Sequence, residues 1–158
     1  MNDLTINTAI EYKLPETARN RHLIAGEWLD SADTFERRSP SHDVVVSVSA
    51  QGDAAMTERA IKAARDTFDA GHWSRISGKE RAAVLLKVAD LIEANEDRIA
   101  VFETLESGKP ISQSRGEVGG AADLWRYAAS LARTSHGDSH NTLGEDMLGV
   151  VLKEPIGV

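Results

Sequence analysis

The C-terminal run VLKEPIGV occupies residues 151–158. Apolar and β-branched residues dominate from Met147 onwards, which predicts a strand that turns towards a buried sheet. The sheet itself would follow Val158. We therefore expect residues 1–158 to be the front part of something larger.

Composition and charge place the chain among ordinary globular proteins. It has 158 residues, enough for one domain, and 41% are apolar and 27% charged. The net charge of -7 would repel phosphate backbones, so we expect no nucleic-acid partner. No run approaches the ~20 apolar residues that span a bilayer, and the N-terminus lacks a basic region before an apolar run. We expect no membrane association and a cytoplasmic location.

The front of the chain predicts short strands. Residues 1–20 carry scattered apolar side chains and are expected to form an arm. Two apolar runs then flank Ala25-Gly26, which is the pattern of a tight hairpin. Phe35 and the β-branched run 44–48 predict further strands, with turn-forming residues 39–43 between them.

Helical periodicity begins after the strands. Apolar residues recur at helical spacing behind Asp53, a plausible N-cap, and Gly71 is expected to end this first helix. Ser77 and Glu80 match a capping box, and an apolar stripe over residues 85–92 follows them. The second helix is therefore predicted to begin at Ser77.

Two more helices are predicted. Asn95 is expected to cap the third helix, and Gly108 is expected to end it. The fourth helix is predicted from about Pro110 to His136, with Gly137 closing it. Its apolar face would comprise Val118, Ala121, Trp125, Ala128 and Ala132.

Local motifs for chemistry are weak. No cysteine is present, which excludes disulfides and thiol chemistry within these residues. Gly108-Lys109 lacks the other residues of a phosphate loop, and helix termination explains it better. The run GEVGG (116–120) lies inside a helical pattern rather than after a strand, so its glycines favour close packing or ligand approach over a dinucleotide fingerprint. His136 and His140 have a zinc-like spacing without a third ligand nearby, so we predict no metal site there.

The remaining candidate side chains are expected to be structural. No Gly-x-Ser-x-Gly elbow is present, so nucleophilic catalysis has no local candidate. Trp28, Trp73 and Trp125 are expected to anchor the core, because nothing basic surrounds them to indicate stacking on nucleic acid.

Six motifs follow one another along the chain. They are LIAGEW (23–28), AIKAAR (60–65), WS (73–74), KVADLI (87–92), ETLESGKP (103–110) and EPIGV (154–158). Each motif is weak alone, but the ordered set covers residues 21–158 at family-like spacing. In that order and spacing the chain resembles the NAD(P)-dependent aldehyde dehydrogenase superfamily, and it is identified as a member.

The resemblance implies an α/β fold with a doubly wound cofactor domain, a catalytic domain and a small β extension that pairs subunits. This chain matches only the N-terminal portion, a β-hairpin plus a helical layer and the start of the oligomerisation hairpin, and the main doubly wound sheet is missing. Residues 1–20 would be an N-terminal arm, 21–137 the N-terminal part of the cofactor-binding domain, and 138–158 the oligomerisation β segment. A homo-oligomer, either a dimer or a tetramer, is implied for the parent enzyme.

The resemblance also implies a reaction. In family members a cysteine thiolate attacks the aldehyde, the thiohemiacetal passes a hydride to NAD or NADP, and a glutamate-activated water hydrolyses the thioester to a carboxylate. No catalytic or cofactor-binding residue can be carried over onto this chain. We therefore expect the chain alone to be inactive, and not to bind NAD or NADP at micromolar affinity.

Two residues match a substrate entrance. Glu117 and Gly120 correspond to helix positions that line the aldehyde entrance in family members, where acidic residues favour cationic aminoaldehydes. With the lead-in Arg19-Asn20-Arg21 and the run GGAA (119–122), they resemble the branch that oxidises gamma-glutamyl-aminobutyraldehyde and related aminoaldehydes. A solvated helix face is the alternative interpretation of Glu117.

A monovalent-cation site is a further implication of the family. The backbone near Arg38 and the carboxylate of Glu106 match positions that hold such a cation in some members. Those members usually have Asp where Glu106 stands, and Asn-Pro where this chain has Ser39-Pro40. The alternative is that Glu106 is a surface acid near a helix C-terminus.

Two hypotheses of different classes follow. The first is an aldehyde dehydrogenase whose sequence is truncated here, and the second is a free-standing interaction module that pairs through its β tail with full-length subunits. Without a cofactor sheet, the apolar stripes at 82–92 and 118–132 would face water, so we expect aggregation or a non-native oligomer. A clean monomer with cooperative melting would contradict that expectation.

Overall fold

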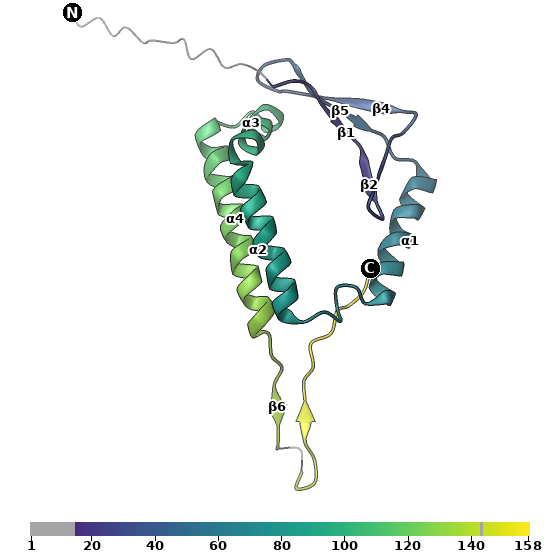
Figure 1. The fold of residues 1–158 in the computed structure, drawn as a ribbon, viewed down its shortest axis with the longest axis vertical. Helices are drawn as coiled ribbons and strands as arrows, with labels where there is room; N and C mark the ends of the chain where they lie inside the picture. The colour runs from purple at the N-terminus through teal and green to yellow at the C-terminus, as the bar shows by residue number, and fades with distance from the viewer. Residues whose placement is uncertain (1–14, 143) are drawn as a thin grey trace, which may run out of the picture.

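A computed structural model describes residues 15–142 and 144–158 (Figure 1). The first five strands lie at one end and the last two at the opposite end, two long helices run side by side on one side, and the first helix of the chain lies on the other side. The order of elements is β1 (Ala18–Asn20), β2 (His22–Ile24), β3 (Glu27–Leu29), β4 (Thr34–Arg38), β5 (Val45–Ala50), α1 (Ala54–Ala70), α2 (Gly78–Ala94), α3 (Glu96–Ser107), α4 (Ile111–Thr134), β6 (Ser139–His140) and β7 (Gly149–Val150).

The predicted hairpin is confirmed. β2 and β3 pair antiparallel, with Leu23 opposite Trp28, and only Ala25 and Gly26 connect them. Both turn residues have positive φ, 53° at Ala25 and 82° at Gly26. Two such residues in succession match the right-handed twist of the flanking strands, which is why this turn type favours short hairpins.

A three-stranded sheet of β1, β5 and β4 forms a second β unit, and it corrects the predicted arm. β4 and β5, expected around Phe35 and over 44–48, pair antiparallel, while β1 pairs parallel with β5. Residues 18–20 therefore belong to this sheet and not to an arm. The rest of the arm prediction, residues 1–14, lies outside the described residues.

The first helix begins and ends as predicted, and the second begins as predicted. The Asp53 side chain accepts a hydrogen bond from the Met56 N–H at 2.7 Å, and Gly71 ends α1 with φ of 72°. At the start of α2, Ser77 Oγ accepts from the Glu80 N–H while the Glu80 carboxylate accepts from the Ser77 N–H. Both donors are thus satisfied by the reciprocal pair that defines a capping box.

The third helix occurs where it was predicted, but its cap is different. Asn95 makes no side-chain hydrogen bond to the start of α3, and its Nδ2 donates instead to the Leu91 carbonyl at 2.8 Å. Only Asn95 separates α2 from α3, and its side-chain amide bonds to a carbonyl group near the end of α2. At the other end, Gly108 ends α3 with φ of 77°, as expected.

The fourth helix ends earlier than predicted. Its C-cap is Ser135, whose N–H bonds to the Leu131 carbonyl, so Gly137 does not close it. Gly137 has another role, because a Cβ there would meet the Val151 carbonyl oxygen at 1.8 Å. The glycine is required by the returning tail and not by the helix terminus.

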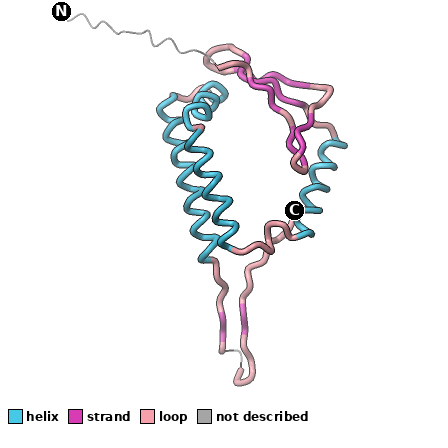
Figure 2. The backbone as a smooth tube through the Cα atoms, viewed as in Figure 1, coloured by secondary structure: helices cyan, strands magenta, loops and turns pink. Residues whose placement is uncertain are grey.

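α2 and α4 form an antiparallel pair that contains much of the core (Figure 2). The seam between them is made of small residues, and Gly78 at the start of α2 would place a Cβ 2.3 Å from the Ala132 carbonyl oxygen. The Arg126 guanidinium crosses the pair and bonds to Asp90 at 3.2 Å and to Glu93 at 2.6 Å. The buried residues of the two helices are Ala82, Ala89, Ser114, Val118, Ala122 and Ala129.

The tryptophans do not anchor this core, contrary to expectation. Trp28, Trp73 and Trp125 are 59%, 46% and 38% exposed. Among the described residues, the largest fully buried side chains are those of Ser47 and Ser114. A core built on small side chains lets helices approach closely but leaves the large apolar groups outside it.

The C-terminal run VLKEPIGV forms no strand, which corrects the prediction made from it. β7 pairs with β6, and the Val151 N–H still bonds to the Asp138 carbonyl at 2.8 Å, but residues 152–158 lack regular structure. A strand persists only where its backbone groups find partners, and the described chain offers none beyond Val151. Ile156 is fully exposed and Leu152 is 75% exposed.

Candidate functional site

Glu117 lies on α4, close to the corner where α3 ends and α4 begins. Gly108 adopts the left-handed conformation that ends α3, and Pro110 precedes the first residue of α4. Lys109 stands between the two helices, and its side chain is only 22% exposed. Beneath the corner, Thr104 Oγ1 and Ser114 Oγ share a hydrogen bond of 2.8 Å, with Ser114 completely buried. This bond fixes α3 against α4.

Both carboxylate oxygens of Glu117 have partners. Lys109 Nζ donates to Glu117 Oε2 at 2.5 Å, and Gln113 Nε2 donates to Glu117 Oε1 at 2.9 Å. The same ammonium lies 2.7 Å from Glu103 Oε1 on α3. We call Glu103, Lys109, Gln113 and Glu117 the corner cluster.

The corner cluster is charged at neutral pH. Hydrogen bonds from Lys109 and then Gln113 lower the pKa of the Glu117 carboxyl, while burial opposes this shift. Hydrogen bonds to Glu103 and Glu117 raise the pKa of Lys109. With two carboxylates and one ammonium, the cluster keeps one net negative charge, which suits it to attract a single cation.

Three glycines of α4 lie near Glu117 in sequence, and of these the predicted entrance residue Gly120, three residues along, lies on the same side of the helix as this carboxylate. A Cβ added at Gly116, Gly119 or Gly120 would meet no atom within 4 Å outside its own helix turn. Close packing against the described residues therefore does not explain these glycines. The backbone of α4 is open to approach on this part of its surface.

Glu106 and the segment after Arg38 are brought close together. Ser47 Oγ donates to Glu106 Oε1 at 3.2 Å, and a Cβ on Gly108 would lie 3.1 Å from Pro40 Cγ. The Arg38 guanidinium itself pairs with Glu36 and Asp43, each at 3.4 Å. The monovalent-cation site at Arg38 and Glu106 stays a prediction.

A groove of about 530 Å³ lies beside Glu106, between the β1 and β5 strands and the α2 and α3 helices. Its walls are mostly apolar, with Ile92 and Phe102 among them, and Glu103 and Glu106 add two carboxylates. Glu103 already pairs with Lys109, and Glu106 already accepts from Ser47. Arg98 also lines the groove, with its guanidinium carbon 6.0 Å from the centre of the Phe102 ring. The groove can therefore receive an apolar group beside charges of both signs.

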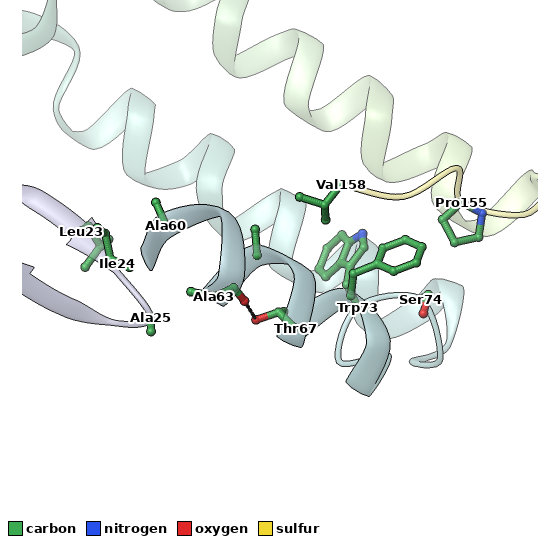
Figure 3. A pocket seen from close by; sticks show the side chains of 12 residues that line it. Leu23, Ile24, Ala25, Ala60, Ala63, Thr67, Trp73, Ser74, Pro155 and Val158 are labelled. Atoms are coloured by element: carbon green, nitrogen blue, oxygen red, sulfur yellow. Dashed lines mark hydrogen bonds between the residues drawn. The ribbon is translucent and has the colours of Figure 1, made fainter. Parts of the chain in front are cut away.

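A second pocket, of about 460 Å³, lies between α1, the β2–β3 hairpin and the C-terminal tail (Figure 3). Trp73 lies beside the tail residues Pro155 and Val158, and alanines of α1 form the opposite wall. None of the lining side chains is titratable. The pocket can hold apolar atoms. Its two hydroxyls, of Thr67 and Ser74, have no titratable side chain beside them in the lining to activate either one.

Metal ligands do not converge in the part of the chain that the structure describes. Within residues 15–142 and 144–158, no three His, Asp or Glu side chains are grouped to hold a metal ion. His136 Nδ1 is 2.8 Å from the Thr134 carbonyl oxygen, and His140 lies in β6. Of the helices described, none combines the length and apolar character required to cross a membrane.

Lys109 and Gln113, which donate hydrogen bonds to Glu117, are not identified as its partners in the sequence analysis. Gln113 and Glu117 are four residues apart on one helix, the spacing at which side chains meet, so that contact had a signal in the sequence. Lys109 lies outside both helices. The position of its ammonium depends on how α3 and α4 are joined, which no local pattern indicates.

Comparisons with known proteins agree on one family. The profile described as the Aldehyde dehydrogenase family matches residues 28–158. Aldehyde dehydrogenase family 2 member C4 from Arabidopsis thaliana is 36% identical over 155 residues, which cover 96% of this chain and 31% of that protein. NADP/NAD-dependent aldehyde dehydrogenase PuuC from Escherichia coli (strain K12) is 38% identical over 142 residues, covering 88% of this chain and 28% of that protein.

Comparison of the fold with solved structures also identifies aldehyde dehydrogenases as similar proteins. The structure is similar to the crystal structure of an NAD-dependent aldehyde dehydrogenase from Sinorhizobium meliloti, with a TM-score of 0.86 and 46% identity. That match covers 92% of this chain and 30% of the other. The chain thus spans about a third of the length of the relatives that it matches.

Proposed function

Because this chain belongs to the aldehyde dehydrogenase family, we propose that it supplies the N-terminal part of an enzyme that oxidises an aldehyde to a carboxylate with NAD or NADP. The match over residues 28–158 supports the proposal, as do the relatives named for NAD or NADP dependence. Residues 21–137 would belong to the cofactor-binding domain and 138–158 to a segment that pairs subunits of a homo-oligomer. A cytoplasmic location stays a prediction.

Within that enzyme, the role of residues 1–158 would be to bind and orient, not to react. The chain contains no cysteine, so it cannot supply the thiolate that the family reaction requires. We therefore expect the isolated chain to oxidise no aldehyde. We also expect calorimetry to detect no saturable binding of NAD or NADP at micromolar concentrations, and a measured isotherm would contradict this.

We propose that the substrate entrance lies at Glu117 and Gly120. One observation supports this assignment: a carboxylate with both oxygens held lies on the same side of α4 as Gly120, where the backbone is open. A fixed negative charge beside an approachable surface favours an aldehyde with a positive charge at its far end. An aminoaldehyde is therefore the substrate class that we propose.

A charge-removing substitution tests the entrance. In the complete enzyme encoded by the reading frame that contains this chain, Glu117→Gln should raise the KM for 4-aminobutanal about two- to fivefold, because a half-exposed charge contributes about 1 kcal/mol or less. The KM for neutral butanal should not change. Glu58→Gln, at an exposed position of α1, is the matched control. Equal KM changes for both aldehydes would refute the entrance assignment.

An interaction module is the second candidate, and the β6–β7 pair favours it. This hairpin extends away from the helices (Figure 1), and Leu148 and Val150 are 73% and 59% exposed. An exposed apolar strand can add to a sheet of another chain. Pairing through this segment is expected of the enzyme as well, so co-purification of the 158-residue chain with full-length subunits, lost when Val150 is changed to Lys, would support this function if the isolated chain also melts cooperatively as a clean monomer.

A further inference from the structure

Lys109 occupies an unusual place in the corner cluster. Its ammonium bridges α3 and α4, 2.7 Å from Glu103 Oε1 and 2.5 Å from Glu117 Oε2. The side chain is 22% exposed, whereas the Glu117 side chain is 48% exposed. Solvent, or a ligand, therefore reaches the carboxylate more easily than the lysine behind it.

The two hydrogen bonds to Glu117 fix the orientation of its carboxylate. A glutamate that is half exposed would ordinarily sample several rotamers. Here Gln113 fixes Oε1 and Lys109 fixes Oε2, so the carboxylate has one orientation. An ammonium has three donors and no acceptor, and Glu103 remains as its second partner. Lys109 can therefore give up Glu117 without losing all of its charge pairing.

We propose that Lys109 is a positioning residue that acts through Glu117, and that it sets how strongly the entrance prefers a cationic aldehyde. It holds the carboxylate in place and occupies it until the ammonium group of a substrate competes for the same oxygen. The inference rests on the proposed function, since it takes Glu117 to lie at the aldehyde entrance. Lys109 would thus moderate the cation preference that Glu117 creates.

The charge balance of the cluster supports this role. With Lys109 in place, the cluster has one net negative charge, and one bound cation neutralises it. Without the lysine, Glu103 and Glu117 would present two negative charges. A cationic aldehyde would then bind more tightly, an anionic aldehyde more weakly, and a neutral aldehyde about equally.

Substitution of Lys109 in the complete enzyme is the test. Lys109→Met keeps the length and the apolar stem of the side chain, and should lower the KM for 4-aminobutanal about two- to fivefold relative to that for butanal. Lys109→Arg keeps the charge and should restore the ratio of the two KM values. In the Glu117→Gln background, Lys109→Met should have a smaller effect on the KM ratio than in the native enzyme, because only the charge of Glu103 is then left without its partner. The change that Lys109→Met causes in the ratio of the two KM values should become smaller in 0.5 M salt, because salt screens the charges.

The outcomes separate the two proposals. If Glu117→Gln leaves the KM ratio unchanged, the entrance assignment fails and this inference fails with it. If Glu117→Gln changes the ratio and Lys109→Met does not, only the role of Lys109 is overturned. Equal changes of both KM values in Lys109→Met would show a structural role and would also overturn the proposal.

A second readout does not depend on activity. In the 158-residue chain, Lys109→Met should raise the pKa of Glu117 towards its ordinary value, because the largest cause of its lowered pKa is the hydrogen bond from Lys109. Carboxyl chemical shifts followed by NMR titration measure this directly. Lys109→Arg should keep the pKa low. An unchanged pKa in Lys109→Met would overturn the contact on which the inference depends.

Discussion

Single glycines in the helices of this chain have opposite surroundings, and the difference can be measured. Gly78 begins α2, and a Cβ there would lie 2.3 Å from the backbone oxygen of Ala132 on α4. Gly119 lies within α4, and a Cβ there would meet nothing within 4 Å. One glycine is required by the approach of a neighbouring backbone, while the other carries only the entropic cost of glycine in a helix.

Alanine substitutions should separate these two cases. Gly78→Ala should destabilise the chain by about 1–3 kcal/mol, because α2 and α4 must move apart to admit the methyl group. Gly119→Ala should stabilise it by about 0.5–1 kcal/mol, through the higher helix propensity of alanine. Thermal or urea unfolding of both variants checks the prediction. Destabilisation of similar size in both would contradict it.

At the scale of residues, the sequence predicts which residues have a structural role more reliably than it predicts their hydrogen-bond partners. Asp53, Ser77 and Gly108 carry local signals, and each has its predicted role at a helix terminus. Asn95 has an equally good local signal, but its amide bonds to Leu91 because α2 ends one residue before α3 begins. Glu117 was named from a resemblance. Its contact with Lys109 depends on the three-dimensional corner, which sequence does not encode locally.

At the scale of elements, the contribution of a helix terminus to the stability of the folded chain can be tested directly. The capping box of α2 satisfies two backbone donors with the side chains of Ser77 and Glu80. Ser77→Ala should cost about 1 kcal/mol of stability, since the Glu80 N–H loses its partner. Ser77→Asp should retain most of it, because a carboxylate can accept the same bond. Chemical unfolding of the two variants is the measurement, and an equal loss in both would count against the cap.

The helical layer should also lose stability in acid. A hydrogen bond from the Arg126 guanidinium lowers the pKa of Glu93, hydrogen bonds from Ser77 lower that of Glu80, and Lys109 and Gln113 lower that of Glu117. Carboxyls with a depressed pKa in the folded state stabilise it above their unfolded pKa, and this contribution disappears as pH falls through the folded value.

The Tm should therefore decrease between about pH 5 and pH 3, the range that starts near the unfolded pKa of glutamate. Glu93→Gln removes one of these carboxyls and should flatten the decrease. Glu58→Gln, on the exposed surface of α1, should not. A Tm that stays constant over this range, or that falls equally steeply in Glu93→Gln, would contradict the assignment.

At the scale of elements, local patterns predicted the helices and the β2–β3 hairpin well, because the capping residues and the apolar periodicity of each element lie within its own sequence. They failed for residues 151–158. The composition of that run favours a strand, yet its backbone beyond Val151 finds no partner in the described chain and remains irregular. Strand propensity describes how a segment fits a sheet and does not create the sheet.

The whole molecule exposes much apolar surface. Leu124, Tyr127 and Leu131 recur on one face of α4, and they are 65%, 60% and 48% exposed. We expected the apolar stripes over 82–92 and 118–132 to face water. Large side chains such as Leu91 and Leu124 are exposed, whereas Leu85, Val88 and Ile92 are half-buried. The buried residues of the two helices include Ala82, Ala89, Val118, Ala122 and Ala129. Sequence periodicity cannot distinguish these two groups, since α4 is apolar on more than one face.

The exposed face of α4 should make the 158-residue chain associate. We expect size-exclusion chromatography with light scattering to give a mass above 17.1 kDa that increases with protein concentration. Replacing Leu124 and Leu131 with Gln should reduce the association. Ile61→Gln, on α1 and 58% exposed, is the control and should have little effect. A monomer at all concentrations would contradict the prediction.

The parallel pairing of β1 with β5 has a consequence for the order in which the molecule opens. Ala18 pairs with Ser47 across 29 residues, and closing a loop of that length costs about 3 kcal/mol of chain entropy, against only three paired residues. β1 is therefore the strand of its sheet that should detach first, and its amides should exchange with solvent fastest. Ala18 and Asn20 line the groove that contains Ser47 and Glu106. Each detachment of β1 would thus remove one wall of the groove beside the Ser47–Glu106 hydrogen bond and widen the groove on that side.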